Sequence, residues 1–442
     1  MKTWLMKKWD SLRGTFWFLP LLMVAGAAVL SFITLAIDKT ATENGLELTM
    51  AWTFTRGPEG SRALLATVAG SMITIASVCF SITIVALQQA SSQFGPRILH
   101  NFMRDRGNQA VLGTFIAGFT YCLLVLRTVN GTEGNRFVPH LSVTVGLLLA
   151  LAGVAVLIYF IHHASSSIQA EHVIAGVSRD LDDALDRLFP SKLGGEPKRR
   201  EEMPAEFGNP SVPVPAGESG YLQAVNVDWL MGIAVKHDLT LKLENRPGEF
   251  VIRGNPLANG WPAERMTDEA VSALRNAFYL GNRRTLFQDV EFAIDQLVEI
   301  ALRALSPGIN DPFTALACVD RLGAALATVA GKEIPSAYRY DEEGRLRVVA
   351  EGVTPAGIVD AAFHQLRQAS RNNAAVTIRL LETIALLGPR VQTRDLREAL
   401  LTQAEVILEG SREGLPAKID QAAAQGRYES VIAAFRVSVN RA

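Results

Sequence analysis

Four long apolar runs in the first 163 residues constrain the fold of this 442-residue chain more than any other feature. They cover about residues 15–37, 63–90, 110–126 and 141–161. A helix needs roughly 17 to 25 residues to cross about 30 Å of hydrocarbon. We therefore expect residues 1–163 to form a transmembrane domain with four helical spans.

The first run predicts a retained span. It is longer than the apolar core of a signal peptide, and Asp38, Lys39 and Thr40 form a poor cleavage site. Cytoplasmic flanks of membrane proteins carry an excess of Lys and Arg. Seven such residues lie on one side of the four runs (Lys2, Lys7, Lys8, Arg13, Arg97, Arg104, Arg106) and five on the other (Lys39, Arg56, Arg62, Arg127, Arg136). We expect a multi-pass membrane protein with both termini in the cytoplasm.

The remaining residues have the composition of a soluble protein, which predicts a cytosolic domain. Residues 164–219 predict a helical stalk and a Pro/Gly-rich linker, residues 220–262 a small β-module, and residues 263–442 a mainly helical region. The expected fold class is therefore an α-helical polytopic membrane protein with a mainly helical α+β cytosolic domain. A net charge of −1 argues against a nucleic-acid partner.

Local patterns predict several elements of this domain. Leu239, Leu241 and Leu243 alternate with polar residues ahead of a turn at 245–248, which predicts a hairpin with residues 250–253. A second short hairpin is expected around 341–344. Asp311 and Pro312 predict an N-cap and the first position of a helix.

Polar side chains form one stripe along the second apolar run. At about 100° per residue, the members fall within roughly 100° of one another. They are Thr67, Ser71, Thr74, Ser81, Gln88, Gln89 and Ser92. Leu64, Val68, Ile75, Ile82 and Ile84 are expected on the opposite, lipid-facing side. The stripe predicts either a helix-packing seam or the wall of an aqueous pore.

Two features of the predicted spans bear on whether the stripe is a packing seam or a pore wall. Residues 110, 114 and 118, and residues 142, 146 and 150, are small residues four apart, which predicts close helix packing there. No acid falls inside the predicted spans, whereas proton-coupled transporters usually keep one. Four spans rarely enclose a path alone, so a pore would need several copies meeting at the second span.

Candidate sites in the cytosolic domain are few. Glu291, Asp295 and Glu299 lie four apart, which indicates either a cation site or a solvated face with Arg303 as a partner. Residues 308–312 could offer amides to an anion, although capping explains them. His162 and His163 could sense pH. We find no catalytic, cofactor or metal motif, and expect no enzyme activity, cofactor or metal.

Several segments together resemble a known family. They are residues 69–74, 81–83, 93–97, 101–105, 159–163 and 304–312. These segments are similar to those of a bacterial family of predicted integral membrane proteins with no assigned function. The resemblance implies a location in the bacterial inner membrane and four spans followed by a cytosolic domain, but no activity.

The leading hypothesis is an oligomeric ion or small-solute channel, lined by the stripe from Thr67 to Ser92 and assembled or gated by the cytosolic domain. Its partners would be the lipid bilayer and further copies of the same chain. The alternative is a membrane-anchored sensor or scaffold without transport activity. An enzyme acting at the inner membrane surface is a third, weaker hypothesis.

Overall fold

The computed structural model describes residues 15–44, 57–98, 105–131, 137–189, 210–332 and 335–439. The chain divides into two compact units, residues 1–172 and 173–442. The basic flank at residues 2–13 and residues 191–209 of the expected linker lie outside the described residues.

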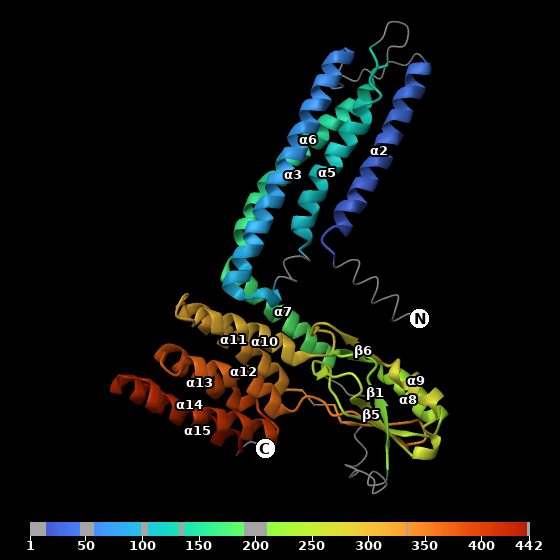
Figure 1. Cartoon of the computed structure of the whole chain (residues 1–442). Helices are drawn as coiled ribbons and strands as arrows, with labels where there is room; N and C mark the ends of the chain where they lie inside the picture. Colours follow the sequence, from blue (N-terminus) through green and yellow to red (C-terminus); the bar gives the residue numbers. More distant parts are fainter. Residues whose placement is uncertain are drawn as a thin grey trace. The chain divides into compact units, whose positions relative to one another are not determined.

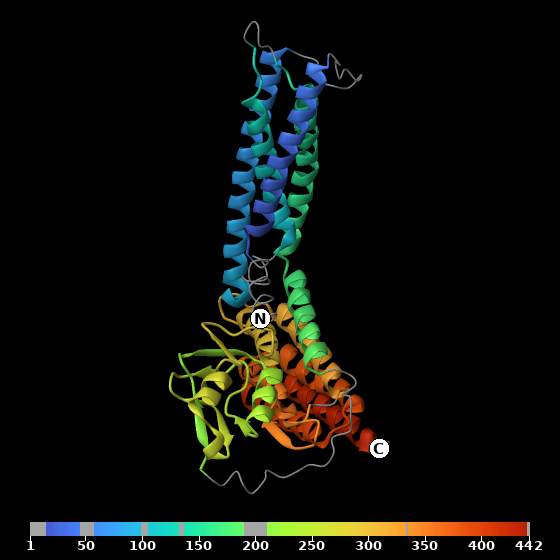
Figure 2. The same ribbon diagram turned by 90° about the vertical axis from the view of Figure 1, so that its right-hand side faces the viewer.

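Unit 1 is built from four long helices that lie side by side (Figures 1 and 2). They are α2 (Phe18–Glu43), α3 (Pro58–Phe94), α5 (Arg106–Leu126) and α6 (His140–Ser167), with a 3-10 turn η1 (Pro96–Ile98) after α3. Each of the four helices is long and apolar enough to cross a membrane, and so is α11 (Pro312–Ala330) of unit 2. The described residues thus hold five candidate spanning helices, where the sequence predicted four.

Small residues let these helices approach closely. A Cβ atom on Gly118 of α5 would collide with the Met72 side chain of α3. A Cβ on Gly146 of α6 would lie 3.1 Å from Leu65 Cδ2 and 3.5 Å from Cys122 Sγ. The predicted seams on α5 and α6 are therefore confirmed at Gly118 and Gly146.

The predicted lipid face of α3 needs correction. Leu64, Val68 and Ile75 are partly buried against the other helices of unit 1, whereas Ile82 and Ile84 are exposed. The reason is that the small-residue seam of α3 lies close to the first three side chains, so α5 and α6 cover them.

Helix α7 (Ala170–Leu188) leads the chain from unit 1 into unit 2, which contains two small sheets. The five-stranded sheet has the order β1-β5-β3-β8-β7 and the three-stranded sheet the order β4-β2-β6. The strands are β1 (Val212–Pro215), β2 (Gly220–Val225), β3 (Thr240–Leu243), β4 (Phe250–Val251), β5 (Pro256–Trp261), β6 (Phe278–Gly281), β7 (Tyr338–Tyr340) and β8 (Leu346–Val349). Strands β7 and β8 come from outside the expected module 220–262.

One predicted hairpin is wrong and the other is confirmed. Strand β3 does not pair with β4; it pairs with β5 and, in parallel, with β8, where Leu241 lies opposite Val348. The turn at 245–248 instead carries the chain into the second sheet, where Phe250 lies opposite Tyr221. Strands β7 and β8 form the hairpin expected around 341–344.

Helices form the rest of unit 2. They are α8 (Val227–Lys236), η3 (Ala263–Arg265), α9 (Asp268–Arg275), α10 (Val290–Ala304), α11, α12 (Pro355–Ser370), α13 (Ala374–Leu387), η4 (Gly388–Arg390), α14 (Arg394–Gly414) and α15 (Lys418–Val439). Side-chain caps start several of them: Asp289 accepts a hydrogen bond from Phe292 N–H, and Thr354 from Gly357 N–H.

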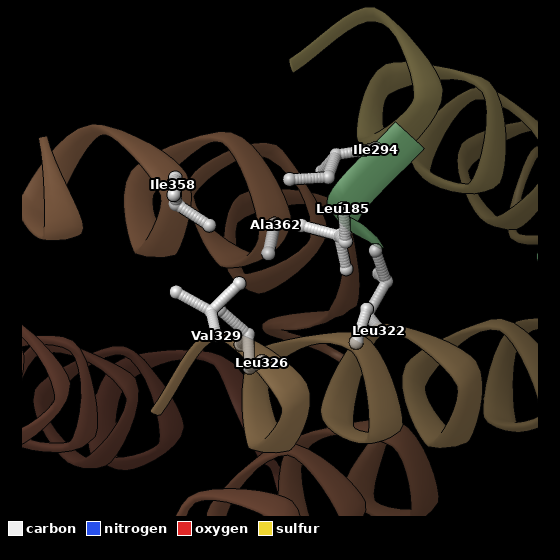
Figure 3. A pocket seen from close by; sticks show the side chains of 8 residues that line it. Leu185, Ile294, Leu322, Leu326, Val329, Ile358 and Ala362 are labelled. Atoms are coloured by element: carbon white, nitrogen blue, oxygen red, sulfur yellow. The ribbon is translucent and has the colours of Figure 1, made fainter. Parts of the chain in front are cut away.

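The helices of unit 2 meet in an apolar core. Leu185 of α7, Ile294 of α10, Leu326 of α11 and Ala362 of α12 point toward one another (Figure 3). The space between them has no room for a water molecule, so we treat it as packing and not as a site.

Candidate functional site

The polar stripe of α3 faces outward from unit 1. Thr67, Ser71, Thr74 and Ser81 are exposed, and so are Gln88, Gln89 and Ser92 further along the helix. Phe94 ends α3, and Gly95 follows with φ 107° ahead of η1. The stripe therefore continues to the C-terminal end of the helix, but the exposed apolar residues Val78 and Val85 lie within it.

The seam of α3 lies on the other side of the same helix. Ala69, Met72, Ala76, Cys79 and Ala90 are buried against unit 1. At about 100° per residue, the directions of these side chains and those of the stripe differ by roughly 180°. The stripe is therefore not a packing seam between helices of one chain, which was one of its two interpretations.

The stripe hydroxyls are satisfied by their own helix. The hydroxyls of Thr67, Ser71 and Thr74 donate to the carbonyl oxygens of Ala63, Thr67 and Gly70 at 2.7, 2.8 and 2.8 Å. Ser81 Oγ donates to Ser77 O at 2.9 Å and Ser92 Oγ to Gln89 O at 2.8 Å. Such bonds let hydroxyls face lipid without an unpaired donor. Outside its own chain, the stripe can therefore face lipid, another copy of the chain, or water enclosed between several copies.

Asp38 corrects the expectation that the spanning helices hold no acid. Helix α2 continues to Glu43, so Asp38 lies inside it and is only 4% exposed. Its carboxylate accepts hydrogen bonds from Leu141 N–H and Ser142 N–H, both at 2.9 Å, and from Ser142 Oγ at 2.7 Å. Because helix N-termini carry partial positive charge, the start of α6 compensates this carboxylate. Asp38 thus ties α2 to α6.

A buried tyrosine hydroxyl adds to the polar contacts between α2 and α6. Tyr121 of α5 is fully buried, and its hydroxyl lies 2.9 Å from Thr34 Oγ1 and donates to Ser142 O at 3.1 Å. Residues of α2, α5 and α6 therefore share one polar network inside the apolar unit. An acid one residue beyond an apolar run, facing a helix start, is the signal that could have identified it.

His163 and Asp105 join α6 to α5. His163 Nε2 lies 2.5 Å from Asp105 Oδ2, and the rings of Tyr159 and His163 are stacked with centroids 5.3 Å apart. Asp105 also caps α5 by accepting from Gly107 N–H at 2.8 Å. His162 is exposed. Sensing of pH by these histidines stays a prediction.

The three carboxylates on α10 are paired with arginines. Glu291 lies 3.7 Å from Arg246. Asp295 lies 2.6 Å from Arg284, and Glu299 lies 3.5 Å from Arg303. All three acids are half-buried, and burial raises the pKa of Glu291. The predicted pair between Glu299 and Arg303 is confirmed, although the three acids are half-buried and not fully solvated. Among the described residues no cluster of His, Cys, Asp and Glu could hold a metal.

The segment 308–312 serves as a helix start. Asp311 Oδ1 accepts from Phe313 N–H at 3.1 Å and Thr314 N–H at 3.2 Å, and Oδ2 accepts from the Thr314 hydroxyl at 2.6 Å. The predicted N-cap and Pro312 start of α11 are confirmed. Capping accounts for these contacts without an anion.

The fold defines a class of protein: an integral membrane protein with a set of long apolar helices and a compact helical and sheet-containing unit. A family model described as "Predicted membrane protein (DUF2254)" matches residues 13–385. The chain belongs to this family.

The comparison with similar proteins does not assign an activity to this chain. The chain is 33% identical over 431 residues to an uncharacterized protein of Mycobacterium bovis and equally to one of Mycobacterium tuberculosis, covering 94% of this chain and 80% of each relative. A partial match, 32% identical over 157 residues, is to AMP phosphorylase of Methanocorpusculum labreanum and covers 33% of this chain and 29% of that protein. No solved structure matches.

Proposed function

We propose that this protein is an oligomeric channel for ions or small solutes in the bacterial inner membrane, with α3 of each copy lining the path. The observation that carries the proposal is the exposed polar stripe on the side of α3 opposite its own seam. No charged residue lies between residues 63 and 94. A charge-free row of polar groups suits a water-filled path.

Several copies are needed because the stripe lies outside the helix packing of one chain. The buried residues of unit 1 lie at the contacts that its four helices make with one another, and the stripe contributes nothing to them. Copies arranged around a rotation axis would bring the stripes to a common centre. The four helices of unit 1 are the spans of this proposal, with both termini on the cytoplasmic side.

Unit 2 is proposed to assemble or gate the path. Helix α6 ends at Ser167, and α7, which begins at Ala170, continues the chain into unit 2 from residue 173 onward. The chain connection between the two units thus passes through α7.

A cysteine scan of positions 67–92 tests the proposal. A polar thiol reagent should label cysteines at 71, 74 and 81 in the membrane-embedded protein and spare those at 73, 80 and 84, because only the first set faces water. Native Cys79 is buried against unit 1 and serves as an unlabelled internal reference.

Uniform protection of all positions would overturn the proposal, because the stripe would then face lipid. The alternative, a membrane-anchored sensor or scaffold, would follow if proteoliposomes also showed no flux under any applied gradient.

A further inference from the structure

We propose that the path lined by α3 selects cations over anions. This inference rests on the proposed channel function and deepens it by naming the class of permeating species. It follows from the direction in which the stripe hydroxyls donate and from where the charged groups at the ends of α3 lie.

The stripe hydroxyls present acceptors and not donors. A Ser or Thr hydroxyl has one proton and two lone pairs. The protons of Thr67, Ser71, Thr74 and Ser81 are all donated to carbonyl oxygens of α3 itself. What remains on the outward side of these oxygens is lone pairs, which coordinate a cation and repel an anion.

The N-terminal end of α3 adds negative charge beside the stripe. Glu59 lies in the first turn and is exposed, and at about 100° per residue its side chain lies within roughly 20° of the stripe's edge. The guanidinium of Arg62 points elsewhere, because its Nε and Nη2 donate to Val129 O at 3.1 and 2.6 Å. A carboxylate at the entrance of a path concentrates cations there.

The C-terminal end of α3 carries groups of both signs. The last carbonyl groups of a helix give a partial negative charge. Gln88 and Gln89 lie near this end, and an amide can turn either its oxygen or its N–H₂ toward the path. Arg97 lies beyond the Gly95 break, in η1. The hydroxyl row and Glu59 therefore set the preference for cations.

Reversal potentials in proteoliposomes under a KCl gradient test the inference. We expect the full-length protein to conduct K⁺ over Cl⁻ by about tenfold, equivalent to about 1.4 kcal/mol. Thr74→Val combined with Ser81→Ala removes two acceptors at nearly constant volume and should lower this ratio several-fold. Glu59→Gln should lower it independently.

Thr83→Val is the matched control. Thr83 lies on α3 and donates to Cys79 O at 2.8 Å, as the stripe hydroxyls do to their own carbonyls, but it is half-buried on the seam side. It should leave the permeability ratio unchanged. A conducting protein with equal permeability, or with preference for Cl⁻, would overturn the cation inference alone. Absence of flux with either ion would overturn the channel proposal itself.

Discussion

Arg347 of β8 shows at the scale of single residues how unit 2 tolerates a buried charge. Its guanidinium Nε donates to Asp341 Oδ2 at 2.8 Å, and Nη1 donates to Asp238 Oδ1 at 2.7 Å. Arg347 lowers the pKa of both carboxylates below their ordinary value. The network connects the β7–β8 hairpin to Asp238, the second residue after α8.

These lowered pKa values predict the acid sensitivity of unit 2. A carboxylate whose pKa is lower in the folded than in the unfolded protein stabilises the fold above about pH 4, and this contribution is lost as the pH falls through the folded pKa. Asp341→Asn should therefore lower the unfolding temperature at neutral pH and flatten its decline below about pH 4. Glu342→Gln, an exposed change in the same turn, is the control. Equal pH profiles for the two variants would contradict this account.

Asp38 marks the limit of prediction at this scale. The apolar run ends at Ile37, so hydropathy alone places Asp38 outside the span. Its burial depends on Leu141 and Ser142, about a hundred residues later, whose amides receive the carboxylate. The residues next to Asp38 in the sequence do not indicate that the amides of Leu141 and Ser142 will bind its carboxylate. Asp311, by contrast, caps the helix that directly follows it, and the sequence alone predicted it.

Elements were predictable where their partners are local. The start of α11 followed from its cap Asp311 and from Pro312 at the first helical position. The pairing of β3 with β8 was not predictable, because it joins Leu241 to Val348 across more than a hundred residues. The alternation of leucines identified β3 as a strand but could not say which strand lies beside it. Likewise, the stripe was evident in the sequence, but its exposure required the structure.

The seam between α3, α5 and α6 supports a prediction at the scale of elements. Gly146→Leu should lower the unfolding temperature, because the added side chain meets Leu65 and Cys122 in a closely packed region and overpacking costs about 1–3 kcal/mol. Gly26→Leu on α2 is the matched control, since a Cβ there meets no atom within 4 Å. Thermal unfolding in detergent measures both. If the two variants unfolded alike, the seam would not hold these helices together.

Assembly is the property of the whole molecule on which the channel depends. A path lined by α3 needs contacts between copies, and these would fall on the flank of the stripe. Ile73, Phe80 and Ile84 lie there at helical spacing and are 38%, 46% and 45% exposed. Large apolar side chains of this kind are candidates for contacts between chains.

Native mass of the intact complex in detergent tests this assembly. The full-length protein should appear as a multiple of 48.0 kDa. Phe80→Ala combined with Ile84→Ala should shift the population toward the single chain, because both side chains would lose their partner in the neighbouring copy. Phe32→Ala combined with Ile33→Ala on α2 removes side chains of similar exposure away from the stripe and should leave the mass unchanged. A single chain in the unmodified protein would leave each stripe facing lipid or detergent, and no path could form around α3.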